Sequence, residues 1–165
     1  MRIILIILVS SLLFASQVFF SPDGGTREQL IKLIQSTTGN VDIAIYSFTS
    51  KELALALLSE QKKGRKIRLI ADRGQGEGKY SVLSLLRASI PVKYLPVTNN
   101  RGMMHNKFMI INNKHLVTGS YNWSTNAEKY NYENCLILEE KALISKFSTE
   151  FNKLWREAVT YDQLQ

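Results

Sequence analysis

Two neighbouring stretches decide the fold of this chain: His105-Asn106-Lys107-Phe108-Met109-Ile110-Ile111-Asn112 and Thr118-Gly119-Ser120-Tyr121-Asn122-Trp123-Ser124. In the first, a histidine and a lysine two residues apart precede an apolar run, which predicts a strand with both polar side chains on one face. Ser120 and Asn122 repeat this spacing on a second predicted strand, with Asn113-Lys114 as the predicted turn between them. The four side chains would meet at one place. They suit a phosphate, because they offer one nucleophile or base and several donors for phosphoryl oxygens.

These stretches resemble the phospholipase D superfamily, whose shared motif reads His-x-Lys, four residues, Asp, then Gly-Ser and an Asn. The chain is most similar to the small, single-motif bacterial members, the Nuc-type endonucleases. Three further segments resemble the family's other short landmarks, in the family's order: Phe20-Ser21-Pro22, Tyr46-Ser47-Phe48-Thr49 and Glu133-Asn134. The resemblance therefore covers about residues 18 to 158. One position departs from the motif, because Asn112 stands where the family has Asp.

Short apolar strands alternate with helical patterns along the chain. Thr26-Arg27-Glu28-Gln29 is a predicted capping box, and Ser50 is a predicted N-cap. Besides the motif pair, strands are predicted at 17–20, 41–46, 66–71, 92–95 and 134–138, and helices at 26–37, 50–63, 80–88 and 141–158. This alternation predicts an α/β fold in which a mixed β-sheet is flanked by helices, with the motif strands as an antiparallel part. The resemblance implies the phospholipase D-like fold, with a single motif per chain.

Length and composition predict a single domain. The chain has 165 residues, 45% of them hydrophobic, which is enough to bury a core. Its formal net charge of +7 favours polyanions such as nucleic acid, or an anionic membrane surface, as partners.

The N-terminal segment has the pattern of an export signal. Arg2 is followed by a 13-residue stretch, Ile3 to Ala15, broken only by Ser10 and Ser11. This length suits a signal-peptide core better than a membrane span, which needs about 20 residues. We therefore expect residues 1–16 to be a signal peptide or, alternatively, an N-terminal membrane anchor, and residues 17–165 to form the nuclease-like domain. In both cases the protein would be exported, to the periplasm or the outer cell surface.

The sequence contains no motif for a metal or another cofactor. CxxC and HExxH motifs and acidic clusters at metal-ligand spacing are absent from it, so we expect no metal and no cofactor. The single cysteine, Cys135, lies in an apolar run and is expected to be a buried hydrophobic residue.

The resemblance implies the role of each site residue. His105 would attack phosphorus, Lys107 and Asn122 would hold the phosphoryl oxygens with help from Ser120, and Glu133 would orient the active histidine. Asn112 is expected to lie behind the motif, on the opposite strand face.

Two aromatic residues are further candidates for substrate binding. Tyr46 and Trp123 lie in the family's landmark segments and could stack on bases, although core packing is an equal alternative. The basic run at 62–66 could contact nucleic acid, but cations also suit the last turn of a helix, and we favour that explanation.

The chemistry that the resemblance implies also needs a second histidine, which would protonate the leaving group and then activate water. His115 has no lysine two residues on and is expected to be an exposed residue at the start of a strand. A homodimer would supply the missing group by bringing His105 of two copies to one site.

The function that the resemblance implies is metal-independent cleavage of nucleic acid, with DNA as the first expectation, RNA as a further one, and single strands as the expected preference. A phospholipase or cardiolipin-type hydrolase of the same superfamily, associated with a membrane through the N-terminal segment, is one alternative. An inactive nucleic-acid-binding module is the other.

Overall fold

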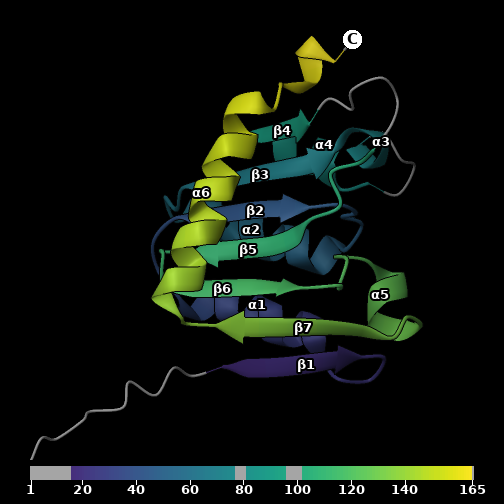
Figure 1. Cartoon of the computed structure of the whole chain (residues 1–165). Coiled ribbons are helices and arrows are strands. Elements are labelled where there is room, and N and C mark those ends of the chain that lie inside the picture. The colour runs from purple at the N-terminus through teal and green to yellow at the C-terminus, as the bar shows by residue number, and fades with distance from the viewer. Residues whose placement is uncertain (1–15, 77–80, 96–101, 165) are drawn as a thin grey trace, which may run out of the picture.

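The computed structural model describes residues 16–76, 81–95 and 102–164. Its centre is a seven-stranded sheet with the strand order β1-β7-β6-β5-β2-β3-β4 (Figure 1). The strands are β1 (Gln17–Ser21), β2 (Val41–Ile45), β3 (Ile67–Asp72), β4 (Val92–Leu95), β5 (Lys107–Ile111), β6 (His115–Gly119) and β7 (Glu133–Leu138). The helices are α1 (Thr26–Ser36), α2 (Lys51–Lys62), α3 (Arg73–Gly76), α4 (Leu83–Arg87), α5 (Thr125–Lys129) and α6 (Lys141–Glu157), followed by the short 3₁₀ turn η2 (Tyr161–Gln163).

The sheet is mixed, as the sequence predicts. β2, β3 and β4 are parallel and are connected through α2 and α4, whereas β5, β6, β7 and β1 add to β2 in antiparallel pairs. The two motif strands, β5 and β6, are direct antiparallel neighbours in the middle of the sheet. The predicted α/β class and the antiparallel motif pair are both confirmed.

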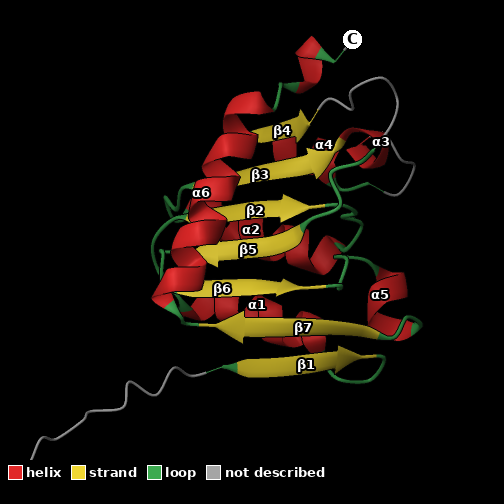
Figure 2. Ribbon diagram, viewed as in Figure 1, coloured by secondary structure: helices red, strands yellow, loops and turns green. Residues whose placement is uncertain are grey.

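Helices cover both faces of the sheet (Figure 2). On one face, Ile144, Phe151 and Leu154 of α6 pack against Phe108 and the buried residues around it. On the other face, α1 and α2 pack on the alternate residues of β2 and β3, including Ile43 and Leu69. Strands buried on both faces read as continuous apolar runs, which is why β2 and β5 show no polar alternation in the sequence.

The two helix starts predicted from capping signals turn out differently. Ser50 caps α2 as expected, because its side chain accepts from the backbone N–H of Leu53 at 3.3 Å. The capping box at Thr26 is wrong: Gly25 occupies the N-cap position of α1 and no side chain caps from there. Instead a carboxylate distant in sequence, Glu128, accepts from the backbone N–H of Arg27 at 3.1 Å. The helix itself is confirmed.

The turn between the motif strands lies one residue earlier than predicted. Asn112 and Asn113 both have positive φ, 53° and 49°, and Lys114 N–H donates to the Ile111 carbonyl at 2.9 Å. This is a two-residue hairpin turn of type I′, for which asparagine is well suited. Asn112 is therefore an exposed turn residue and not, as expected, a strand residue behind the motif.

The structure also bears on the predicted helix at 80–88 and on the N-terminal segment. The predicted helix at 80–88 is shorter, since α4 spans Leu83–Arg87, and position 80 lies outside the described residues. Within the described ranges, no helix is both long and apolar enough to cross a membrane. The expected leader at 1–16 falls almost entirely outside them, because the description begins at Ser16.

Candidate active site

The motif residues gather at one end of the sheet, the end that carries α5 in Figure 1. β2 ends at this edge and β5 begins there, with Ile45 opposite Lys107. β6 also ends there and β7 begins there, with Gly119 opposite Cys135. The strand directions therefore bring together segments that lie far apart in the sequence.

His105 and Lys107 form the first half of the site. β5 begins at Lys107, so His105 lies just before the strand and not within it, contrary to the sequence prediction. The His105 side chain is exposed, whereas Lys107 is only 9% exposed. The Lys107 Nζ donates to the His105 carbonyl oxygen at 2.7 Å and lies 5.0 Å from the centre of the Tyr46 ring. The histidine is accessible and the lysine beside it is held in place.

The surroundings of Lys107 act on its pKa in two opposite directions. Burial lowers the pKa of this lysine below its ordinary value, while the negative charge of Glu133 raises it. Glu133 thus acts electrostatically on the residue expected to hold the phosphoryl oxygens.

Ser120 and Glu133 form the second half of the site. The Ser120 hydroxyl donates to one Glu133 oxygen, and Asn131 Nδ2 donates to the other at 2.9 Å. The same hydroxyl oxygen accepts from Asn134 N–H at 3.1 Å. In the described part of one chain, Glu133 makes no hydrogen bond to His105, so the expected orientation of the histidine by this carboxylate is not made within a single copy.

Gly119 allows this second half to form. Its φ is 152°, and a Cβ at this position would lie 2.2 Å from the Asn134 carbonyl oxygen. Only glycine permits this approach between the end of β6 and β7. Immediately after it, the backbone N–H groups of Ser120 and Tyr121 both donate to that same carbonyl.

Asn122 and Trp123 follow the end of β6. Trp123 is only 3% exposed and packs edge-on against Phe48, with ring centres 4.9 Å apart. This burial does not fit the expected stacking on substrate, and Trp123 is a core residue. Its carbonyl accepts from the N–H groups of Thr49 and Ser50 at 2.8 and 2.9 Å, which joins this segment to the one after β2. The Asn122 Oδ1 is buried and has no hydrogen-bond partner among the described residues.

Two buried carboxylates that sequence reasoning missed form hydrogen bonds with segments next to the site. Glu128 is buried and accepts from the Tyr121 hydroxyl as well as from Arg27 N–H. Asp72, at the end of β3, is 5% exposed. Its carboxylate accepts at 2.9 Å from the backbone N–H of Met104, the residue directly before His105. The sequence signal for Asp72 was an acidic residue at the end of a mainly apolar strand that also contains Arg68.

His115 is not part of the site. It begins β6, at the opposite end of that strand from Ser120, and its Nδ1 lies 3.2 Å from Glu139 Oε1. The expectation of a strand-start position is confirmed, but the side chain is partly buried and not exposed.

Cys135 is buried as predicted, and this burial raises the pKa of its thiol to about 12. In the described ranges, no three His, Cys, Asp or Glu side chains lie close enough to hold a metal ion.

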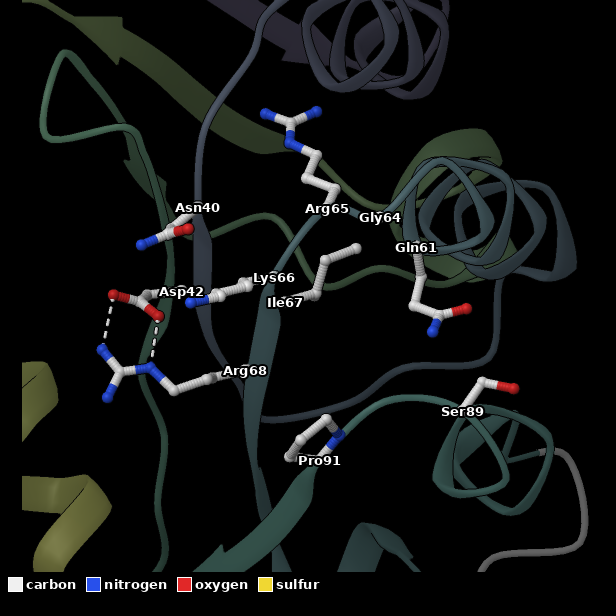
Figure 3. A pocket seen from close by; sticks show the side chains of 10 residues that line it. All are labelled: Asn40, Asp42, Gln61, Gly64, Arg65, Lys66, Ile67, Arg68, Ser89 and Pro91. Carbon is white, nitrogen blue, oxygen red and sulfur yellow. Dashed lines mark hydrogen bonds and ion pairs between the residues drawn. The ribbon is translucent and has the colours of Figure 1, made fainter.

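A cavity of about 580 Å³ lies at the opposite end of the sheet from the motif (Figure 3). Its polar side chains do not converge: Lys66 and Asp42 extend to one side of β3, and Gln61 and Ser89 to the other. Arg68 forms two hydrogen bonds with Asp42, at 2.7 and 2.8 Å. The lining is completed by Asn40, Gly64, Arg65, Ile67 and Pro91.

The basic run at 62–66 mostly serves the structure. Arg65 Nε donates to the Gly39 carbonyl at 2.6 Å, and its guanidinium also reaches the Ile34 carbonyl at the end of α1. Lys63 pairs with Glu60 at 2.7 Å. These contacts support the helix explanation for Lys63 and Arg65, and leave Lys62 and Lys66 exposed.

Comparison with known proteins places this chain and its fold in a family. Residues 30–155 match the family model described as "Cardiolipin synthase, PLD-like domain". NucT from Helicobacter pylori is 31% identical, with a TM-score of 0.82 over 90% of this chain and 99% of that one. Nuc from Salmonella typhimurium, a phospholipase D family member, is 26% identical, with a TM-score of 0.81 over 90% of this chain and 98% of that one.

A curated relative, the mitochondrial cardiolipin hydrolase of Canis lupus familiaris, is 32% identical over 130 residues, 78% of this chain. The matched region spans 50% of that relative's length. The family model covers most of the chain, and the Nuc-type structures match nearly all of it. The chain therefore belongs to the phospholipase D superfamily, and its fold is that of the Nuc-type members.

Proposed function

We propose that this protein is a phosphodiesterase that cleaves nucleic acid, with DNA and preferably single strands as substrate. The observation that carries the proposal is the gathering of His105, Lys107, Ser120 and Glu133 at one end of a Nuc-type fold. Two structures whose names identify them as NucT and Nuc match the chain over at least 90% of its length.

The proposed reaction has two steps. An imidazole nitrogen of His105 attacks phosphorus, an N–P bond forms, and the bond to the leaving oxygen breaks. A second, protonated imidazole gives its proton to that oxygen. The same group then takes a proton from water, which attacks phosphorus and releases the histidine. Lys107 stabilises the charge on the phosphoryl oxygens from a position fixed before the substrate arrives.

The second imidazole is proposed to come from a second copy of the chain. The sequence has only two histidines, and His115 is separated from the site by the length of β6, about 13 Å at the usual rise per residue. His105 is exposed at the end of the domain, where it can approach its counterpart across a two-fold axis. A dimer would also let Glu133 of one copy orient the histidine of the other.

Charge favours a polyanion as the substrate. The net charge is +7, and the sequence contains no recognisable base-reading element such as a zinc finger. We therefore expect binding that depends on phosphates more than on base sequence, and that weakens steeply as salt rises.

A lipid phosphodiester is the second candidate, because a curated relative is named as a cardiolipin hydrolase. The direction of β1 supports nucleic acid over lipid. β1 begins at Gln17, at the far end of the sheet, and reaches the site end only at Ser21, which pairs with Glu133. If residues 1–16 served as a membrane anchor, the domain would be attached at the end away from its site.

The first experiment compares substrates directly. The purified full chain is incubated with labelled single-stranded DNA, double-stranded DNA and RNA, and with vesicles containing cardiolipin, each with and without EDTA. Cleavage of nucleic acid that survives EDTA is the expected result. Hydrolysis of lipid alone would replace the proposal by the second candidate, and loss of cleavage in EDTA would contradict the mechanism.

The second experiment tests the histidine. His105→Ala should abolish turnover but leave binding of single-stranded DNA largely intact, because the positive charge remains. His115→Ala is the matched control and should retain activity, since its side chain lies at the other end of β6. Normal turnover by His105→Ala would remove the assigned nucleophile.

The third experiment tests the shared site. Wild-type chain is mixed with His105→Ala, and the copies are allowed to exchange. If one site needs both histidines, an equal mixture retains about one quarter of the wild-type activity and not one half. A proportional fall, or a fully active monomer in light scattering, would contradict the dimeric site.

A further inference from the structure

Tyr46 touches both residues that begin the motif. Its ring centre lies 4.6 Å from that of His105, with the planes tilted by 55°, and 5.0 Å from Lys107 Nζ. The backbone is fixed as well, because Tyr46 N–H donates to the Asn106 carbonyl at 2.9 Å. We propose that Tyr46 is a positioning residue that fixes the His105 imidazole within its own chain, and that Asp72 fixes the backbone leading into the histidine.

The histidine needs such a support. Its side chain is exposed, and no described group of the same chain hydrogen-bonds to the ring. Both oxygens of Glu133 are already engaged, by Ser120 and Asn131. The Tyr46 ring is therefore the contact that restricts imidazole rotation before a second copy or a substrate is present. An exposed imidazole without it would sample several rotamers, and few of them would aim a ring nitrogen at phosphorus.

Asp72 supplies the second part of this arrangement. Its Oδ2 accepts from Met104 N–H and its Oδ1 from Gly74 N–H, both at 2.9 Å. The carboxylate thus joins the end of β3 to the residue that precedes His105. The neighbouring Gln75 Nε2 reaches the Tyr46 hydroxyl at 3.4 Å, so the segment after β3 contacts the tyrosine as well as the motif backbone.

This role differs from stacking on a substrate base, the other use that an aromatic residue has near such a site. A stacking residue contributes to binding, so its loss raises KM. A positioning residue acts on the fraction of correctly aimed histidine, so its loss lowers kcat and leaves KM nearly unchanged. The proposal depends on the proposed function only for this kinetic part.

The histidine NMR spectrum tests the positioning without any substrate. The chain has two histidines, so a protein labelled with ¹³C only at the imidazole Cε1 gives two signals, and the His105→Ala spectrum assigns them. The nearby Tyr46 ring should displace the His105 signal through its ring current. Tyr46→Leu and Tyr46→Met, which both replace the ring by a flexible or branched aliphatic chain, should abolish that displacement, whereas Tyr46→Phe should keep it. The His115 signal should not move in any of them, which also reports that each variant is folded.

Kinetics on single-stranded DNA complete the test. Tyr46→Leu should lower kcat by about 10- to 100-fold with KM within about threefold, and Tyr46→Phe should stay close to wild type. Asp72→Asn keeps the side-chain shape but turns an amide NH₂ towards a backbone N–H, so it should shift the His105 signal and lower kcat. Glu60→Gln is its control, since Glu60 is also a buried carboxylate but lies in α2 and pairs with Lys63.

The proposal is overturned if the His105 signal is the same in wild type, Tyr46→Leu and Tyr46→Met, or if Tyr46→Leu raises KM with kcat unchanged. Failure of the proposed function looks different. In that case the wild-type protein leaves nucleic acid intact, while the ring-current displacement and its loss in Tyr46→Leu are still observed and support the positioning.

Discussion

Replacing Gly119 by alanine tests how tightly the end of β6 must approach β7. The added Cβ would lie 2.2 Å from the Asn134 carbonyl oxygen and 2.9 Å from its carbonyl carbon, both backbone atoms that cannot rotate away. Real Cβ contacts lie beyond 3.0 Å, so the two strands must separate by nearly 1 Å. The backbone conformation, φ 152°, adds strain for any residue with a Cβ.

Two effects of different size follow. Strain and overpacking of this kind each cost about 1–3 kcal/mol, so we expect the free energy of unfolding to fall by about 2–6 kcal/mol. The separation also displaces Ser120 and its bond to Glu133, and a displacement of about 1 Å at a catalytic group can cost on the order of 100-fold in rate.

Urea unfolding and cleavage of single-stranded DNA measure the two effects. Gly64→Ala is the matched control, because Gly64 also has a positive φ, 88°, but a Cβ there meets nothing within 4 Å. It should lose a little stability and no activity, since it follows α2 at the far end of the sheet. If Gly119→Ala behaves like Gly64→Ala, the close approach of β6 and β7 does not hold the site together.

Three further results are expected. Glu133→Gln removes the charge that raises the pKa of Lys107, so the alkaline limb of the kcat/KM profile should move to lower pH. An unmoved limb would contradict this influence of Glu133 on the pKa of Lys107. Cys135, whose buried thiol has a pKa raised to about 12, should react with a thiol reagent only after denaturation, and fast reaction of the native protein would contradict its burial. Glu128→Ala leaves the Tyr121 hydroxyl and a helix N–H without their acceptor, and should lower the free energy of unfolding by about 2–4 kcal/mol in urea, whereas a change below 1 kcal/mol would exclude a supporting role.

Much of the fold was predictable because its signals are local. Apolar runs of four to six residues gave the strands, and Ser50 identified the start of α2 through a bond to a residue three positions away. The capping box at Thr26 failed for the opposite reason. The start of α1 is satisfied by Glu128, which follows it by 101 positions, and no local pattern reports such a partner.

The sequence predicted which motif residues lie near one another better than it predicted their contacts. His105, Lys107 and Ser120 do lie at one end of the sheet, but the predicted strand positions were wrong for two of them. His105 precedes β5, and Ser120, like Asn122, follows β6. The burial of Trp123 depends on Phe48, which reaches it from another segment, so stacking and core packing could not be separated beforehand. Asp72 was missed because its partners are backbone N–H groups, so its position at the end of a strand does not reveal which segments it joins.

The pairing of β1 with β7 has a consequence for the order in which the sheet forms during synthesis of the chain. Ser21 and Asn131, joined by a hydrogen bond, are 110 positions apart, so at ordinary rates of synthesis the first strand waits roughly 5 to 20 seconds for its neighbour. During that time the growing chain has neither Glu133 nor the strand that carries it. A ribosome-bound fragment that already contains His105 and Lys107 therefore still lacks Glu133 and its strand β7. The surroundings of His105 are complete only when β7 has been made.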